Sequence, residues 1–229
     1  MMQPDAHRPE SLSPRGLAIL GWVAFLVAGT LFLALAWDVA ARRPIVDLDV
    51  AVSEWLEDHR QAGLTAFLLA VSQVHALAAI GAWSVAFALV LAKLREWFWM
   101  LTLTLAVGGG MLLNVAFKVA FERARPDMDD PLVILDTFSF PSGHVAASTV
   151  FYGVLAAYLV SRFHRPALRA TFIAGAATMV ALVAFSRVYL GAHYLSDVLA
   201  AACSSTTWLV LCLATVHGMV RARMGRIGR

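Results

Sequence analysis

The sequence GLAILGWVAFLVAGTLFLALAW occupies residues 16–37 and contains no Asp, Glu, Lys or Arg. An uncharged apolar run of this length matches the roughly 20 residues that a helix needs to cross the hydrocarbon core of a bilayer. The whole chain of 229 residues has the same character, because 60% of its residues are hydrophobic and only 14% are charged. Soluble domains carry about 25% charged residues. We therefore expect an integral membrane protein.

Five further stretches lack charged residues over a similar length, and with the first they predict an all-α bundle of six transmembrane helices. They are residues 61–92, 97–117, 145–161, 170–186 and 198–220, with the second helix expected at about 65–90. No repeat or linker divides the chain, so we expect a single domain over residues 1–229. The small residues Ala34-Leu35-Ala36 resemble a signal-peptide cleavage site. The preceding apolar run exceeds the 7–15 residues of a signal core, which favours an uncleaved first helix.

Basic residues collect on one side of this predicted bundle. Eleven of the eighteen Lys and Arg residues lie in the two termini and in the segments 93–96 and 162–169. The positive-inside rule therefore predicts two cytoplasmic termini, in a bacterial inner membrane, and three polar segments on the periplasmic side. The net charge of +3 is scattered over several loops, which argues against a nucleic-acid partner.

The segment between the first two predicted spans, residues 38–60, interleaves apolar and acidic side chains. Val50, Trp55 and Leu56 alternate with Asp49 and other acids. This pattern fits a short amphipathic helix on the outer interface. A solvated loop with a single apolar anchor at Trp55 fits it as well, and both interpretations remain open.

Metal and disulfide chemistry find no support in the pattern of ligand residues. The two cysteines, Cys203 and Cys212, are nine residues apart and point to roughly opposite faces of one apolar helix. Carboxylates and histidines do not occur at metal-ligand spacing. We expect neither a bound metal nor a cofactor.

Three polar clusters fall at the ends of predicted spans, all on the expected outer side. They are Lys118 with Arg125-Pro126, then Pro141-Ser142-Gly143-His144, and finally Ser186-Arg187 with His193 and Asp197. Lys118 and Arg125 are two helical turns apart, so they would share a face if the third span continued until Pro126 ended it. Both could instead be basic residues that only reach for the membrane surface.

The second and third clusters suit chemistry on an anion. Free N–H groups and the positive end of the dipole at a helix start favour an oxyanion, and Ser142, Gly143 and His144 stand at such a start. His193 and Asp197 are four residues apart, so the carboxylate can fix one imidazole nitrogen and leave the other as a nucleophile. An ordinary helix cap and a structural His–Asp pair are the simpler alternatives.

Together the three motifs resemble the type 2 phosphatidic acid phosphatase superfamily, which includes vanadium haloperoxidases and bacterial acid phosphatases. The pattern reads Lys-x6-Arg-Pro, Pro-Ser-Gly-His and Ser-Arg-x5-His-x3-Asp, with every defining position filled. The resemblance implies a metal-independent phosphohydrolase in which the phosphoryl oxygens are held by Lys118, Arg125, Arg187, Ser142 and Gly143. It further implies that His193 attacks phosphorus to give a phosphohistidine, that Asp197 orients it, and that His144 protonates the leaving oxygen.

We therefore expect a lipid phosphate phosphatase whose partners are its lipid substrate and the surrounding membrane lipids. Candidate substrates are undecaprenyl diphosphate, placed slightly first, phosphatidic acid, phosphatidylglycerol phosphate and phosphorylated lipid A. A lipid phosphotransferase with the same site is the main alternative, and a transporter is a weaker one because no span carries a charge deep in its middle. Nothing in the sequence indicates an oligomeric state. Two features stay open: whether Asn114 extends the site inward or bonds another helix, and whether the acids of residues 127–140 face the site.

Overall fold

The computed structural model describes residues 14–133 and 135–227, and every regular element in this part of the chain is a helix. The helices are, in chain order, α1 (Pro14–Ala40), α2 (Ile45–Asp58), α3 (Ala62–Val74), α4 (Leu77–Lys93), α5 (Trp97–Thr104), the π-helical turn η1 (Leu105–Gly109), α6 (Gly110–Phe121), α7 (Gly143–Arg162), α8 (Pro166–Tyr189) and α9 (Leu195–Ile227). The predicted all-α class is confirmed.

Five helices of the described chain are long and apolar enough to cross a membrane. They are α1, the continuous run from α5 through η1 to α6, and the three helices α7, α8 and α9. A sixth span results if α3 and α4 are counted together. The predicted transmembrane bundle is thus confirmed, with helix ends within a few residues of the uncharged stretches.

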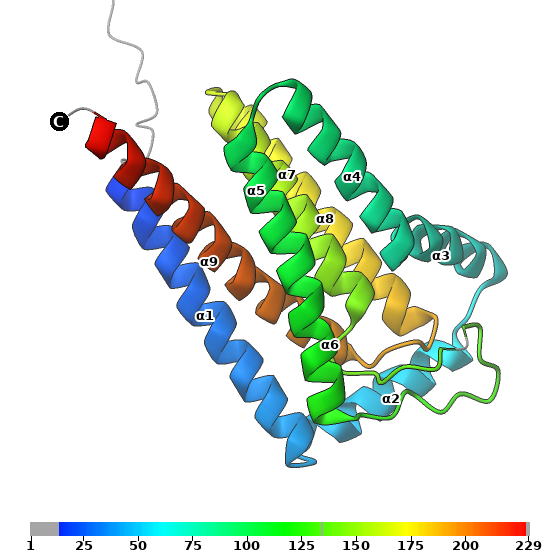
Figure 1. The fold of residues 1–229 in the computed structure, drawn as a ribbon. Coiled ribbons are helices and arrows are strands. Elements are labelled where there is room, and N and C mark those ends of the chain that lie inside the picture. The colour runs from blue at the N-terminus through cyan, green and yellow to red at the C-terminus, as the bar shows by residue number, and fades with distance from the viewer. Residues whose placement is uncertain (1–13, 134, 228–229) are drawn as a thin grey trace, which may run out of the picture.

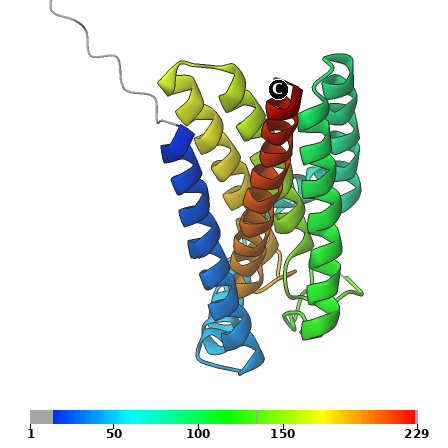
Figure 2. The same ribbon diagram turned by 60° about the vertical axis from the view of Figure 1, so that its left-hand side comes forward.

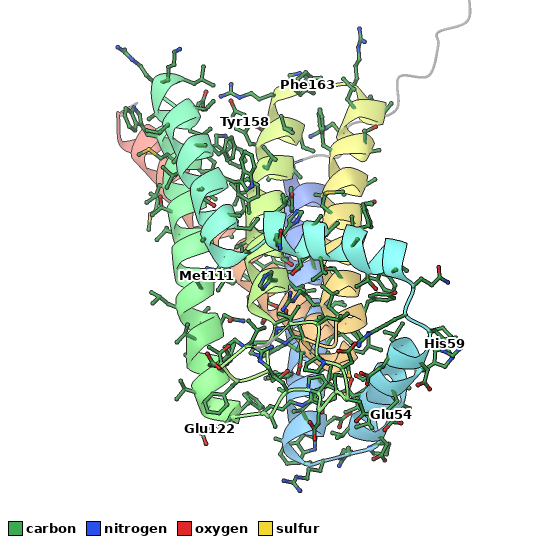
Figure 3. The ribbon with its side chains drawn as sticks, turned by 90° about the vertical axis from the view of Figure 1, so that its right-hand side faces the viewer. Glu54, His59, Met111, Glu122, Tyr158 and Phe163 are labelled. Carbon is green, nitrogen blue, oxygen red and sulfur yellow. The ribbon has the colours of Figure 1, made fainter. Side chains whose placement is uncertain are left out.

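The second span differs from the single helix expected at about 65–90. It is divided at His75 and Ala76 into α3 and α4, which meet at a 50° bend. Figure 3 shows α3 lying across the bundle, whereas α4 runs along it. Polar contacts inside the protein hold the end of α3: His75 Nε2 lies 2.7 Å from the Tyr152 hydroxyl, and Ser72 accepts a hydrogen bond from Arg187.

Residues 38–60, for which two interpretations were open, contain the last residues of α1, a turn at 41–44, the helix α2 and a short turn after it. Its buried face carries Asp49, Ser53 and Leu56, while Val50 and Trp55 are exposed. Figure 1 shows α2 lying across the ends of the long helices. The buried face of α2 therefore includes a carboxylate and a hydroxyl, whereas its exposed face mixes apolar side chains with acids such as Glu54.

The long helices pack as a bundle in which α9 lies along α1 and α7 contacts both α8 and α9 (Figures 1 and 2). Close approach of α7 and α9 depends on Gly153, where an added Cβ would stand 2.2 Å from Leu209 Cδ2. Gly109 similarly faces the Trp208 ring. A Cβ on Gly110 would stand 3.3 Å from Val150 Cγ1, whereas a Cβ on Gly108 would meet nothing within 4 Å.

One end of the bundle, here called the site end, carries the loops 41–44, 122–142 and 190–194. The opposite end carries the short connections 94–96 and 163–165. Figure 3 labels Glu122 at the first end and Phe163 at the second. All three polar clusters of the sequence lie at or next to the loops of the site end.

Candidate active site

The three polar clusters meet at the site end. His193 Nδ1 lies 3.5 Å from Asp197 Oδ2, and Arg125 Nη1 lies 3.3 Å from His193 Nε2. The backbone N–H of Ser142 donates to the Asp197 carbonyl at 3.2 Å. Distant parts of the chain therefore form one polar centre, as the motif spacing predicts.

His193 and Asp197 occupy the turn into α9. His193 lies just before the helix, with its N–H donating to the Arg187 carbonyl at 3.2 Å, and Asp197 lies in the first turn. Only 2% of His193 is exposed and Asp197 is fully buried. Burial, together with the charges of Arg125 and Arg187, lowers the pKa of His193 to about 4 although Asp197 acts in the opposite direction. The imidazole is therefore neutral at pH 7.

Arg125 reaches the centre from a loop rather than from a helix. Lys118 and Arg125 would share a helix face only if the third span continued to Pro126, but α6 ends at Phe121 and Glu122 has the left-handed conformation, φ 43°. From the loop 122–142, the Arg125 guanidinium donates to the carbonyls of Thr137 and Ala192. Lys118, on the last turn of α6, donates to the Phe138 carbonyl.

Arg187 is the most deeply placed cation of the site, with 1% of its surface exposed. One Nη donates to Ser72, at the end of α3. The Nε and the second Nη find no hydrogen-bond partner within residues 14–133 and 135–227. A buried guanidinium with free donors is suited to bind the oxygens of an anion.

The Pro-Ser-Gly-His segment begins α7. Ser142 is the N-cap residue in an extended conformation, but its hydroxyl does not cap the helix and is buried without a partner among the described residues. A Cβ on Gly143 would stand 3.4 Å from Asn114 Oδ1, so glycine permits this close approach. Asn114 Nδ2 donates to the Pro141 carbonyl at 3.2 Å. Asn114 therefore bonds the segment before α7 and does not extend the site.

His144, half-buried on the first turn of α7, stands within electrostatic range of His193, Arg125 and Arg187. Lys118 is within the same range of Arg125 and Arg187. Three cations and two histidines thus surround one small volume. No three His, Cys, Asp or Glu side chains of the described chain are placed to hold a metal ion.

Three residues of this centre were missed by sequence reasoning. Ser139 Oγ donates to Asp197 Oδ2, and Arg123 donates to Asp197 Oδ1 at 2.6 Å. Asp49, from α2, accepts a hydrogen bond from Arg123 at 2.7 Å. The available signals were weak: an extra Arg two residues before Arg125, and an acid among the apolar positions of a short helix.

The acids between the first two motifs are not among the charges that act on Lys118, Arg125 or Arg187. Asp127, Asp129, Asp130 and Asp136 are all exposed. The Asp130 backbone is held instead, by Glu57 and Arg60 at the end of α2. Their carboxylates therefore do not compete with an anionic substrate for the three cations.

This arrangement can be compared with known proteins. Residues 97–221, which contain all three motifs, match the PAP2 superfamily. The chain belongs to the PAP2 superfamily. The resemblance that the motifs carry is confirmed.

A curated match and a solved structure both come from Bacillus subtilis. Phosphatidylglycerophosphatase B of strain 168 is 43% identical over 110 residues, which are 46% of this chain and 51% of the relative. The match thus spans about half the length of this curated relative. The crystal structure described as the first transmembrane PAP2-type phosphatidylglycerolphosphate phosphatase, from Bacillus subtilis, is 30% identical, covers 84% of this chain and 95% of its own, and superposes with a TM-score of 0.75.

A more distant structure, LpxE of Aquifex aeolicus, is 21% identical, covers 73% of this chain and 95% of its own, and gives a TM-score of 0.58. This last comparison supports the fold alone. With its apolar helices, the chain is therefore an integral membrane protein with the fold of the transmembrane PAP2 enzymes.

Proposed function

We propose that the protein is a metal-independent lipid phosphate phosphatase that works through a phosphohistidine. The observation that carries the proposal is that a neutral buried imidazole, His193, lies near Arg187, whose Nε and one Nη have no partner among the described residues. The first can attack phosphorus, and the second can hold its oxygens. Membership of the PAP2 superfamily supports the same chemistry.

The attacking atom follows from the contacts of the ring. Because Nδ1 faces Asp197, the proton is assigned to Nδ1 and the lone pair to Nε2. Arg125 lies 3.3 Å from this Nε2. A phosphoryl oxygen bound to Arg125 would thus place phosphorus next to the nucleophile.

The transfer then proceeds in two steps. The lone pair of His193 Nε2 forms the P–N bond while the P–O bond to the lipid breaks, and His144 donates its proton to the departing oxygen. Water, deprotonated by the now neutral His144, next attacks phosphorus and releases inorganic phosphate and His193. Lys118, Arg125 and Arg187 balance the charge on the equatorial oxygens, aided by Ser142 and the backbone at Gly143.

We propose phosphatidylglycerol phosphate as the first substrate to test, because the Bacillus subtilis curated match and solved structure are both named as phosphatases of it. Phosphatidic acid and undecaprenyl diphosphate are the next candidates. An apolar groove of about 430 Å³ between α1, α6 and α9 supports a substrate with a tail. Phe117, at one end of the groove, directly precedes Lys118.

The deciding experiment measures phosphate release by the purified protein, reconstituted in vesicles, from each of these lipids and from phosphorylated lipid A. Turnover is expected to persist in excess EDTA, because three side-chain cations neutralise the substrate, and to be inhibited by vanadate, which mimics phosphorus under attack. Turnover that EDTA abolishes and Mg²⁺ restores would overturn the proposal. Phosphate transfer to a second lipid without release of inorganic phosphate would instead identify a phosphotransferase.

A further inference from the structure

A buried chain of charges connects α2 to the nucleophile. Asp49 is fully buried on α2, and its Oδ2 accepts a hydrogen bond from Arg123 Nη2 at 2.7 Å. The other guanidinium nitrogen, Nη1, donates to Asp197 Oδ1 at 2.6 Å. One guanidinium thus bridges two carboxylates that stand 148 positions apart in the sequence numbering, one on α2 and one on α9.

Ser196 and Tyr194 make further contacts with the two residues of this bridge. Asp49 Oδ1 accepts the backbone N–H of Ser196 at 2.8 Å, and the Ser196 hydroxyl donates to Asp49 Oδ2. The Arg123 guanidinium also lies 4.3 Å from the centre of the Tyr194 ring. Helix α2 is therefore bonded to the first turn of α9, where Asp197 stands.

The two oxygens of Asp197 have separate partners. Oδ1 faces Arg123, whereas Oδ2 faces His193 Nδ1 and accepts hydrogen bonds from Ser139 Oγ and the Tyr194 backbone. A carboxylate held on both sides cannot rotate away from the imidazole. Both terminal nitrogens of Arg123 and both carboxylate oxygens of Asp49 are engaged by partners within the protein.

We propose that Arg123 and Asp49 are positioning residues for the phosphohistidine chemistry, acting on His193 through Asp197. The proposal rests on the proposed function of the same site. It gives α2 a part in the reaction: Asp49 aims Arg123, Arg123 holds and partly neutralises Asp197, and Asp197 orients His193 without making the imidazole strongly basic.

The charges around Arg123 and His193 support the same role. Burial alone would lower the pKa of Arg123, but the charges and hydrogen bonds of Asp197 and Asp49 outweigh burial and raise it, so Arg123 stays charged. The charged and titratable groups that face His193 are Asp197 from α9, Arg125 from the loop 122–142, Arg187 from α8 and His144 from α7. Arg123 offsets the single negative charge in this set.

The test compares Arg123→Met, Arg123→Lys and, as a matched control, Arg162→Met. Arg162 also pairs with an acid, Glu96, but at the opposite end of the bundle. Arg123→Met is expected to lower kcat about 10- to 100-fold, as loss of a supporting hydrogen bond often does, with little change in KM. It should also move the acid limb of kcat/KM upward by about 1 pH unit, because an unshielded carboxylate favours imidazolium.

Arg123→Lys keeps the charge but loses the fork that reaches both carboxylates. It should lower kcat and leave the acid limb in place. Arg162→Met should resemble the wild type in kcat, KM and pH profile. The proposal would be overturned if Arg123→Met had the acid limb of the wild type and a kcat no lower than that of the control.

Arg123→Met leaves Asp49 buried without its partner, so this variant can fail to fold. The double variant Arg123→Met with Asp49→Asn removes the stranded charge, and it should show the same upward shift of the acid limb. His193→Ala, run beside it, separates the two proposals. If His193→Ala retains turnover, the proposed function fails; if it loses turnover while both Arg123→Met variants keep the wild-type pH profile, only the positioning role fails.

Discussion

His193 and His144 stand in the same centre but in different surroundings. His193 is 2% exposed and bonded within the turn into α9, whereas His144 is half-buried and borne on the first turn of α7. If His193 forms the P–N bond, His193→Ala is expected to abolish turnover and to leave no phosphoenzyme. If His144 only protonates the leaving oxygen, His144→Ala should cost about 10²–10⁴-fold on a lipid alkoxide and less on p-nitrophenyl phosphate, whose leaving group needs little protonation.

The measurement is phosphate release from both substrates, with alkaline trapping of ³²P on the protein because acid destroys phosphohistidine. Asn114→Ser serves as a control for general disturbance, since Asn114 bonds the Pro141 carbonyl and not the substrate. Label on His193→Ala, or equal losses on both substrates for His144→Ala, would contradict the assigned roles.

The buried imidazole also determines a pH dependence. The pKa of His193 is lowered from its usual 6.5 to about 4, so the nucleophilic neutral form persists as pH falls until about pH 4. We expect the acid limb of kcat/KM, which reports the free enzyme, near pH 4 and not near 6.5. Because the folded state holds this proton less tightly than the unfolded chain, His193 also makes folding more favourable as pH rises from about 4 to 6.5. A pH-rate profile in vesicles checks the first expectation, and an acid limb near 6.5 refutes it.

At this scale the motif residues could be predicted and their supporting partners could not. Lys118, His144 and Arg187 stand in motifs whose spacing predicts that they meet at one end of the bundle. Arg123 and Ser139 acquire their role only from contacts with Asp197, more than 50 residues away along the chain. The residues next to Arg123 and Ser139 in the sequence do not indicate that Asp197 is their partner.

At the scale of elements, the contact of α7 with α9 is decided by Gly153. An added Cβ would stand 2.2 Å from Leu209 Cδ2, so the leucine must move. Gly153→Ala is expected to lower the free energy of unfolding by about 1–3 kcal/mol, the usual cost of overpacking. The double variant with Leu209→Ala should recover part of this loss, since the shorter side chain removes the clash.

Gly175→Ala on α8 is the matched control, because a Cβ at Gly175 would meet nothing within 4 Å. It should be neutral or slightly stabilising, as alanine favours helix over glycine. Thermal unfolding in detergent measures all four proteins. Equal stability of Gly153→Ala and Gly175→Ala would show that the helices separate without cost.

The uncharged stretches of the sequence predict the transmembrane helices, but they do not predict the bend between α3 and α4 or the end of α6. The bend between α3 and α4 falls at His75 and Ala76, where the sequence has neither proline nor glycine. It follows from contacts of Ser72 and His75 with α8 and α7. The end of α6 likewise depends on the left-handed conformation of Glu122, which a glutamate rarely adopts. Both features are products of tertiary packing.

At the scale of the whole molecule, the distribution of Lys and Arg predicts that the site end faces the periplasm. Single cysteines test this orientation in a background with Cys203→Ala and Cys212→Ala. Asp130→Cys at the site end is expected to react with an impermeant maleimide applied to intact cells, whereas Arg165→Cys at the other end should react only after permeabilisation. Both side chains are exposed, so access to the reagent depends on the membrane alone. The reverse labelling would place the site in the cytoplasm.

The loop 122–142 is a place where the chain can be split into two fragments. Between described helices it is the one long connection, since the others have five residues or fewer. A break near residue 130 would leave Lys118 and Arg125 on one fragment and His144, Arg187 and His193 on the other. Packing of α1 on α9 and of α6 on α7 joins these fragments without the peptide bond. A gene split at this point should therefore yield two polypeptides that are inert when expressed singly and regain turnover when co-expressed, a complementation assay for assembly inside the bilayer.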